Sequence, residues 1–344
     1  MNYLLCERMK EIFLMRGEKS RMREMKRKVV DLDCYFHDEP FAEEVRDPFM
    51  RMMDEVPLRR EESMPKQFTR EEVLERLQKE IQNGRPILVA GAGIGITAKF
   101  AELGGADLIG VYNSGLYRMD GHGSSAGSMP FGDANEIVLE MGLRSIMPVV
   151  KNIPVIAGVC GTDVTRVMRI FLKQIREAGF SGVMNFPTVG SLDGNFRQRL
   201  EDLGMGYKKE VEMIRLAGEM GLFTICYAYN PQEAESMARA DVDVLIAHMG
   251  LTTGGSLGSK RAVKLEETVP RVQTILNVAK EIKKDIIFLA HGGPISSPED
   301  TEYIYQHTDA VGFLGASSIE RIPVERAIQS ATEAFKSRPL KKRG

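Results

Sequence analysis

Two short segments of the sequence repeat the same chemistry. Residues 246–250 (IAHMG) and 289–293 (LAHGG) each place a histidine at the end of an apolar run and close to a glycine. Histidine titrates near neutral pH, so His248 and His291 are candidate general acids or bases, or donors to an anionic ligand. The alternative is that either one is a hydrogen-bonded histidine of the core. The repeated position favours a functional role for both.

Small residues follow the second histidine and the last apolar run. Residues 291–296 (HGGPIS) and 315–321 (GASSIER) supply glycine and serine at positions where backbone N–H groups can approach an anion closely. We therefore expect a phosphate-binding site here, although tight turns without a ligand have the same composition. The candidate substrate-binding residues are Gly292, Gly293, Gly315, Ser317 and Ser318.

A long segment after the second apolar run carries a further polar set. Residues 114–132 (SGLYRMDGHGSSAGSMPFG) contain Arg118 and His122, with Tyr117 and Asp120 between and beside them. Long loops in compact domains are usually functional or disordered. We interpret residues 114–132, here called the lid segment, as a loop that closes over the ligand with Arg118 as its clamp. The alternative is a flexible surface loop.

Other polar or small residues stand where apolar runs end. Asn113 and Asn185 are candidates to orient a substrate and are counted with the catalytic residues, and a carboxylate at Asp163 could help to hold Mg²⁺. The remaining candidate ligand contacts are Gly91, Gly93 and Tyr227. The sequence GAGIG at 91–95 lacks the third glycine of the dinucleotide-binding pattern at its proper place, so we do not predict a dinucleotide site.

The elements that position these residues form a regular series. Eight short, nearly uncharged runs alternate with helical patterns, which is typical of strands buried on both faces of a parallel sheet. The count predicts an α/β protein with a closed (β/α)₈ TIM barrel, whose functional end lies at the strand C-termini. The predicted strands are 86–91, 107–113, 154–161, 182–187, 223–229, 244–250, 286–293 and 310–317, and the clearest helices are 164–178, 207–220, 231–240, 265–282 and 324–335.

Domain limits and compartment follow from composition. Residues 67–337 form the predicted barrel, preceded by a charged N-terminal extension at 1–66 and followed by a basic tail at 338–344. The extension is either a flexible arm or an element that docks on the barrel or on a neighbouring subunit, and we expect a homo-oligomer. A net charge of −2 argues against nucleic-acid binding. Without a membrane span, a signal peptide or a CxxC pair, the sequence predicts a cytoplasmic protein.

Four segments resemble a known family. They are residues 90–95 (AGAGIG), 110–115 (GVYNSG), 185–190 (NFPTVG) and 290–294 (AHGGP). In these residues the sequence is similar to the phosphoenolpyruvate hydrolase-like, or TIM-barrel signal-transduction, family. That family is similar to the C-terminal barrel of plant tobamovirus-resistance proteins and, more distantly, to the phosphoenolpyruvate mutase/isocitrate lyase superfamily. In the mutase relatives, acidic residues near strands two to four hold Mg²⁺, whereas this sequence has Asn113 and Asn185 at two of those strand ends.

Two functional hypotheses follow. The first is an enzyme of this family that acts on a small phosphorylated or carboxylated metabolite by hydrolysis or enolate-forming bond cleavage, with Mg²⁺ as a possible cofactor. The second is a non-catalytic sensor or interaction protein that retains the anion site of the barrel. Turnover of a small phosphorylated acid would favour the first, and saturable binding without turnover the second.

Overall fold

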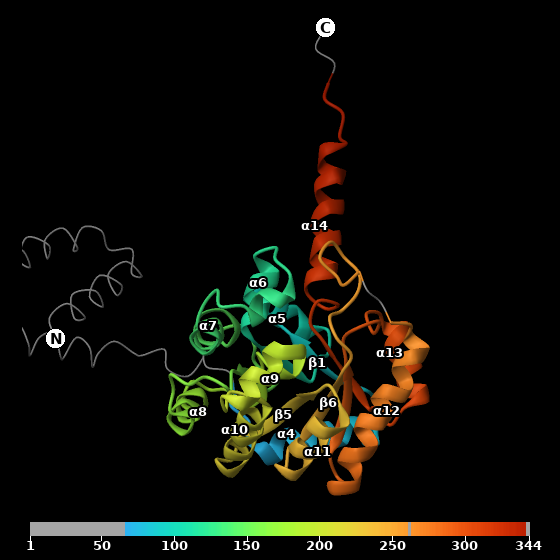
Figure 1. Cartoon of the computed structure of the whole chain (residues 1–344). Helices are drawn as coiled ribbons and strands as arrows, with labels where there is room; N and C mark the ends of the chain where they lie inside the picture. Colours follow the sequence, from blue (N-terminus) through green and yellow to red (C-terminus); the bar gives the residue numbers. More distant parts are fainter. Residues whose placement is uncertain (1–65, 261–262, 342–344) are drawn as a thin grey trace, which may run out of the picture. The chain divides into compact units, whose positions relative to one another are not determined.

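Eight parallel strands close into a barrel, as the sequence predicts (Figure 1). The computed structural model describes residues 66–260 and 263–341, so nearly all of the expected N-terminal extension lies outside the described residues. Each strand pairs with its neighbours in sequence, and β8 pairs with β1 to close the ring. The strands are β1 (Ile87–Gly91), β2 (Leu108–Val111), β3 (Val155–Val159), β4 (Gly182–Asn185), β5 (Phe223–Ala228), β6 (Val244–His248), β7 (Ile287–His291) and β8 (Gly312–Gly315).

The strands form where the apolar runs lie, because a strand covered by helices outside and by side chains inside needs no polar face. All residues of β3, β5, β6 and β7 are buried. Several predicted runs extend one or two residues beyond the observed strand at its C-terminal end. Those last residues, among them Asn113 and Gly293, have left the ladder to bond with loops.

Helices surround the strands, except for the last one, which extends away from them (Figure 1). They are α4 (Arg70–Gln82), α5 (Gly95–Leu103), α6 (Asn113–Met119), α7 (Ala134–Met141), α8 (Met168–Glu177), α9 (Gly194–Asp202), α10 (Tyr207–Glu219), α11 (Pro231–Arg239), α12 (Leu265–Ile282), α13 (Pro298–His307) and α14 (Arg321–Lys336). The predicted helix over 265–282 has the observed bounds. The helices at 194–202 and 298–307 were not among the predicted ones.

The segment before β1 covers the N-terminal end of the barrel. Thr69 and Glu72 form a capping box that starts α4. Arg70 binds the carboxylate of Asp243, just before β6, with N–O distances of 2.7–3.0 Å. The backbone N–H of Phe68 donates to Ser181, just before β4. These contacts leave the opposite end, where the strands finish, as the open face for a ligand.

The lid segment is more ordered than the sequence suggests. Its first residues belong to helix α6, and Ser124–Ser128 form a 3₁₀ turn, η1. The expectation of a structureless loop over 114–132 is therefore corrected. Strand β2 ends at Val111, so the chain enters a helix at Asn113, two residues after the strand.

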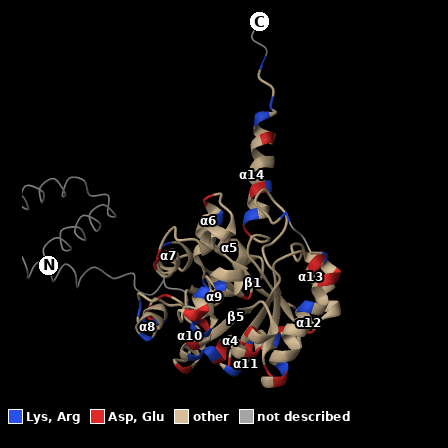
Figure 2. Ribbon diagram, viewed as in Figure 1, with Lys and Arg blue, Asp and Glu red and all other residues tan. Residues whose placement is uncertain are grey.

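Charge is spread over the helices around the barrel. Figure 2 shows lysine and arginine interspersed with aspartate and glutamate on the outer helices, while the strands are free of both. The basic tail begins after α14, and its described residues, 338–341, are exposed. Among the described helices, none has the length and apolar character needed to cross a membrane.

Candidate active site at the barrel mouth

The two predicted histidines lie side by side at the C-terminal end of the barrel. His248 ends β6 and His291 ends β7, and the register of the two strands pairs them directly. Their ring centroids are 4.5 Å apart and the rings meet edge to face. Both residues are buried.

Backbone partners fix the two rings as opposite tautomers. The N–H of Gly250 donates to Nδ1 of His248 at 3.0 Å, so that nitrogen has no proton and Nε2 of the neutral ring carries it. Nδ1 of His291 lies 2.6 Å from the carbonyl oxygen of Leu314, which can only accept, so Nδ1 is the protonated nitrogen. His248 therefore presents an Nε2–H donor and His291 an Nε2 lone pair.

Both histidines are neutral at pH 7. Burial lowers the pKa of His248 well below its usual value, and the neighbouring His291 lowers it further. Burial also lowers the pKa of His291 to about 4, against the bond to Leu314, which favours the protonated form. A neutral pair with one donor and one acceptor can polarise a carbonyl oxygen with one ring and accept a proton with the other.

Aromatic side chains line the mouth beside the histidines. Tyr227, on β5, lies 5.0 Å from the ring of His248 and 5.4 Å from that of His291. Tyr229 stacks on His248 at 4.3 Å, and Phe186 lies between Tyr112 and Tyr227. This aromatic wall lowers the effective dielectric around the polar groups beside it, which strengthens their electrostatic effect.

Arg118 lies buried next to this wall. It pairs with the carboxylate of Glu320 at 2.5 Å, and its Nη1 donates to Ser114. Its guanidinium also lies 5.2 Å from the centre of the Tyr112 ring. Burial lowers the pKa of Arg118, but Glu320 together with Tyr112 and Tyr227 raises it above its usual value, so the cation is kept. The predicted clamp is thus already held in place by Glu320.

Four buried polar atoms at the mouth have no hydrogen-bond partner within the described structure. They are Tyr112 Oη, Asn113 Oδ1, Arg118 Nη2 and Ser318 Oγ. The Tyr112 hydroxyl faces Tyr227 and Arg118 without a well-aligned bond to either. Buried polar atoms are normally satisfied, because an unmade bond costs about 1–3 kcal/mol. Their concentration between β1, β2 and β8 favours a small polar ligand as the missing partner.

The lid segment is bound to the mouth at two points. Asn113 donates through Nδ2 to the carbonyl oxygen of Gly127 at 2.9 Å. The hydroxyl of Ser124 lies 3.3 Å from that of Ser317. The segment therefore lies against the ends of β2 and β8, while His122 is exposed at the turn after α6.

Two of the glycines predicted to contact the ligand use their N–H groups for bonds within the protein. The N–H of Gly93 donates to Glu320 at 2.7 Å, and that of Gly293 donates to the carbonyl of Gly250 at 2.9 Å. Gly293 has φ +58°, and a Cβ there would lie 2.6 Å from the carbonyl oxygen of Met249. Gly91, Gly292 and Gly315 are buried at the ends of β1, β7 and β8.

Asn185 belongs to a network that includes a residue absent from the predicted site. Its Oδ1 accepts from the N–H of Tyr227, and its Nδ2 donates to the carboxyl of Glu210 at 2.6 Å. Glu210, on α10, is fully buried and also accepts from the N–H of Val189. Glu210 lies on the same face of α10 as the buried residues Tyr207, Met213 and Ala217. The three- and four-residue spacing of these residues in the sequence could have indicated that Glu210 is buried.

The residues present do not fit a Mg²⁺ site. Asp163 uses both oxygens: Oδ2 binds Asn135 and Arg166, and Oδ1 binds Thr165. Although burial opposes it, this bonding lowers the pKa of Asp163 to about 2. Among the described residues, no three His, Cys, Asp or Glu side chains are grouped as a metal site requires.

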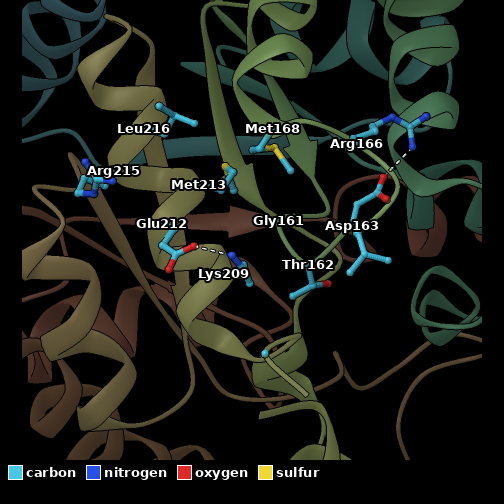
Figure 3. Close-up of a pocket in the computed structure, with 12 residues that line it drawn as sticks. Gly161, Thr162, Asp163, Arg166, Met168, Lys209, Glu212, Met213, Arg215 and Leu216 are labelled. Carbon is cyan, nitrogen blue, oxygen red and sulfur yellow. Dashed lines mark hydrogen bonds and ion pairs between the residues drawn. The ribbon is translucent and has the colours of Figure 1, made fainter. Parts of the chain in front are cut away.

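A separate cavity of about 480 Å³ lies between the start of α8 and α10 (Figure 3). Its charged side chains already have partners: Arg166 pairs with Asp163, and Lys209 pairs with Glu212. The polar atoms that lack partners are at the barrel mouth, so we place the candidate site there.

The fold and this site define a (β/α)₈-barrel protein with a candidate site at the C-terminal ends of its strands. The structure is similar to that of phosphoenolpyruvate phosphomutase from Streptomyces platensis subsp. rosaceus, with a TM-score of 0.53 over 77% of this chain and 86% of that one, at 16% identity. That likeness shows the fold. The chain belongs to the phosphoenolpyruvate hydrolase-like family, whose pattern matches residues 72–337. The resemblance noted in the sequence is confirmed.

Two tomato (Solanum lycopersicum) proteins are similar in sequence. The ToMV susceptible protein tm-1(GCR26) is 54% identical over 290 residues, and the ToMV resistance protein Tm-1(GCR237) is 57% identical over 266 residues. The matches cover 84% and 77% of this chain. They cover 38% and 35% of the tomato proteins, so this chain spans little more than a third of their length.

Proposed function

We propose that the chain is an enzyme that acts on a small phosphorylated or carboxylated metabolite at the barrel mouth. The observation that carries this proposal is the neutral pair of His248 and His291, held by the backbone in opposite tautomers. A binding protein needs no such arrangement, whereas acid–base chemistry uses a donor and an acceptor at one reacting centre. The family description, hydrolase-like, agrees with it.

The pair suits hydrolysis or cleavage of a bond next to a carbonyl group. When such a bond breaks, the electron pair left on carbon delocalises onto the carbonyl oxygen as an enolate. The Nε2–H of His248 would donate to that oxygen, and Nε2 of His291 would take the proton from the hydroxyl group or water that loses it. A fixed donor at a developing oxyanion lowers a barrier by up to about 3–4 kcal/mol.

The charge of the mouth limits the ligand. Arg118 is offset by Glu320, and both histidines are neutral, so the mouth carries little net charge. A carboxylate or phosphate that enters it would raise the pKa of His291 from its value of about 4, because a nearby negative charge favours the protonated form, and so would make Nε2 a stronger proton acceptor. Ligand binding should therefore take up protons close to the pKa of His291, about 4, while His291 stays the neutral base at pH 7.

Turnover assays test the proposal. Wild-type protein, His291→Asn and His248→Asn are incubated with phosphorylated and keto-acid metabolites, with and without Mg²⁺, and products are followed by phosphorus and proton NMR. We expect wild-type turnover, with His291→Asn losing rate but keeping affinity. His307→Asn, an exposed histidine at the end of α13, is the matched control. Full activity of both mouth variants would refute the assignment.

The alternative is a non-catalytic sensor of an anionic metabolite. It is favoured by the absence of a carboxylate cluster among the described residues of the mouth and by the names of the tomato relatives, which refer to virus susceptibility and resistance. A thermal-shift screen separates the two functions. A ligand at 100 times its dissociation constant adds about 2.7 kcal/mol of stability, and such a shift without turnover would favour the sensor.

The proposed setting of this activity is the cytoplasm. Cys160 and Cys226, the cysteines within the described residues, are free thiols. Free thiols are typical of a reducing compartment.

A further inference from the structure

Two buried donors at the barrel mouth lie together and lack an acceptor. Arg118 and Tyr112 are each 3% exposed. Nη2 of Arg118 and Oη of Tyr112 have no hydrogen-bond partner within the described residues. The guanidinium carbon of Arg118 lies 5.2 Å from the centre of the Tyr112 ring, and the Tyr112 hydroxyl faces both Arg118 and Tyr227. We call Arg118 Nη2 and Tyr112 Oη the donor pair.

The residues beside the Tyr112 hydroxyl offer it no side-chain oxygen. A Cβ at Gly91 would lie 2.7 Å from this hydroxyl and 3.2 Å from Ala316. The hydroxyl therefore lies between the ends of β1 and β8, where one neighbour has no side chain and the other has only a methyl group. Buried polar groups are normally hydrogen-bonded, so the donor pair indicates an acceptor that a ligand supplies.

The bonds already made by Arg118 limit what the donor pair can offer. Its Nε binds Glu320, and its Nη1 donates to Ser114 at 2.9 Å. Nη2 carries two N–H groups, and the Tyr112 hydroxyl carries one further donor. Three donors can serve both oxygens of a carboxylate. A phosphate ester presents three strongly accepting oxygens and would leave some of them without a donor here.

The charge around the donor pair restricts the ligand further. Glu320 is fully buried and offsets the charge of Arg118. A ligand that reaches the donor pair therefore brings its own charge into a nearly neutral, buried site. The cost of taking an ion out of water rises with the square of its charge, so a dianion is disfavoured far more than a monoanion.

We propose that the donor pair is a carboxylate subsite, which selects monoanionic carboxylates over phosphate esters. The proposal rests on the proposed function and decides between the two ligand classes that it leaves open. Tyr227, which the Tyr112 hydroxyl faces, lies 5.0 Å from the ring of His248 and 5.4 Å from that of His291. A carboxylate bound to the donor pair would place the rest of its molecule beside the two histidines.

The same binding would involve the lid segment. Arg118 belongs to α6, the first part of that segment. The two atoms of the donor pair are closed off from solvent, so a carboxylate reaches them only when the lid segment moves. Once bound, it would hold α6 against the end of the barrel.

Propionate and ethyl phosphate compare the two ligand classes on the same ethyl group. At about pH 7.5 propionate is a monoanion, whereas ethyl phosphate, with a second pKa of about 6, is mostly a dianion. Saturation-transfer NMR on the ethyl protons, at increasing ligand concentration, measures the dissociation constant of each for the full-length chain. We expect propionate to bind at least about 10-fold more tightly. Equal affinity, or a preference for ethyl phosphate, would overturn the proposal.

Tyr112→Phe removes one member of the donor pair and keeps the ring. Because the hydroxyl has no partner in the free protein, the variant should unfold at the same urea concentration as wild type or at a higher one. Propionate should bind about 10-fold more weakly. Tyr303→Phe, on α13, is the matched control and should change neither quantity.

Two results for Tyr112→Phe would contradict the subsite. A lowered urea midpoint would show that a buried water already satisfies the hydroxyl. An unchanged affinity for propionate would show that the carboxylate binds elsewhere. Either result would overturn the proposal.

Failure of the subsite and failure of the proposed enzyme give different results. If propionate binds as expected but no metabolite is turned over, the subsite stands and the enzyme assignment falls. If His291→Asn slows turnover of a phosphorylated metabolite that Tyr112→Phe converts at the full rate, the enzyme assignment stands and the subsite is overturned.

Discussion

Glu210 allows a sharp test of the electrostatics near the mouth. Its carboxyl group is fully buried and takes hydrogen bonds from Asn185 at 2.6 Å and from the N–H of Val189 at 2.7 Å. Burial raises the pKa of Glu210 from 4.5 to about 8, although these bonds and one with Thr188 act in the opposite direction. We therefore expect Glu210 to be protonated in the folded protein at pH 7.

The sign and size of the effect on stability follow from proton linkage. Between pH 4.5 and about 8 the folded state keeps this proton while the unfolded state has lost it. The free energy of unfolding therefore falls as pH rises, by up to about 1.4 kcal/mol per pH unit, and by about 5 kcal/mol over the whole interval. Below pH 4.5 both states hold the proton, and the stabilisation relative to alkaline pH is complete.

The substitution Glu210→Gln removes the titration and keeps the size of the side chain. Its amide N–H₂ must face Asn185 or Val189, both donors, so the variant should carry a constant cost of about 1–3 kcal/mol. The pH-dependent part is separate from this cost. The difference in unfolding free energy between variant and wild type should move in favour of the variant as pH rises from 4.5 to 8.

Urea unfolding followed by circular dichroism at several pH values measures this slope. Glu219→Gln, which removes an exposed carboxylate from the last turn of the same helix α10, is the control. If the difference between Glu210→Gln and wild type has no more pH dependence than the control, Glu210 is ionised in the folded state. The burial argument would then be refuted.

Three further results are expected at the mouth. Arg118→Ala should lower the free energy of unfolding by about 3–5 kcal/mol, because it leaves Glu320 buried without its cation; an unchanged urea midpoint would contradict the buried pair. Hydrogen exchange in residues 121–132, the part of the lid segment after helix α6, should be fast without ligand and slow in a ligand-saturated sample, and exchange that stays fast would count against a lid. Binding of an anionic metabolite should take up protons at about pH 5, just above the pKa of His291, as seen by calorimetry in buffers of different ionisation enthalpy, and an absence of uptake would show that the ligand does not raise that pKa.

The barrel could be predicted from the sequence because each strand corresponds to a short apolar run that can be recognised by itself. The runs 86–91 and 286–293 are apolar apart from His291 and end in glycine, a pattern that needs no knowledge of distant residues. The structure of the lid segment was harder to predict. Its glycines predict a loop, but α6 begins two residues after β2 because the N–H of Gly115 bonds to the carbonyl oxygen of Tyr112 and starts the turn.

In the candidate site, too, some features follow from the local sequence and others depend on residues far apart in the chain. The matched histidines could be predicted, because strands that are neighbours in sequence are neighbours in the ring and bring their last residues together. Their tautomers could not, since these depend on one local N–H, from Gly250, and on one carbonyl, Leu314, from another strand. The sequence pattern therefore predicts where each histidine lies, whereas its tautomer depends on the groups that bond to its ring.

The ion pair at the mouth extends this argument to function. Arg118 and Glu320 are 202 residues apart in sequence and meet only because β8 closes on β1, which brings the start of α14 beside the lid segment. Glu320 also accepts from Gly93, so one carboxylate connects the loops after β1, β2 and β8. Residues that look like separate ligand contacts in the sequence are thus one network. A ligand that accepts a hydrogen bond from the unpartnered Nη2 of Arg118 would bind to a network that connects the lid segment, the loop after β1 and the first residues of α14.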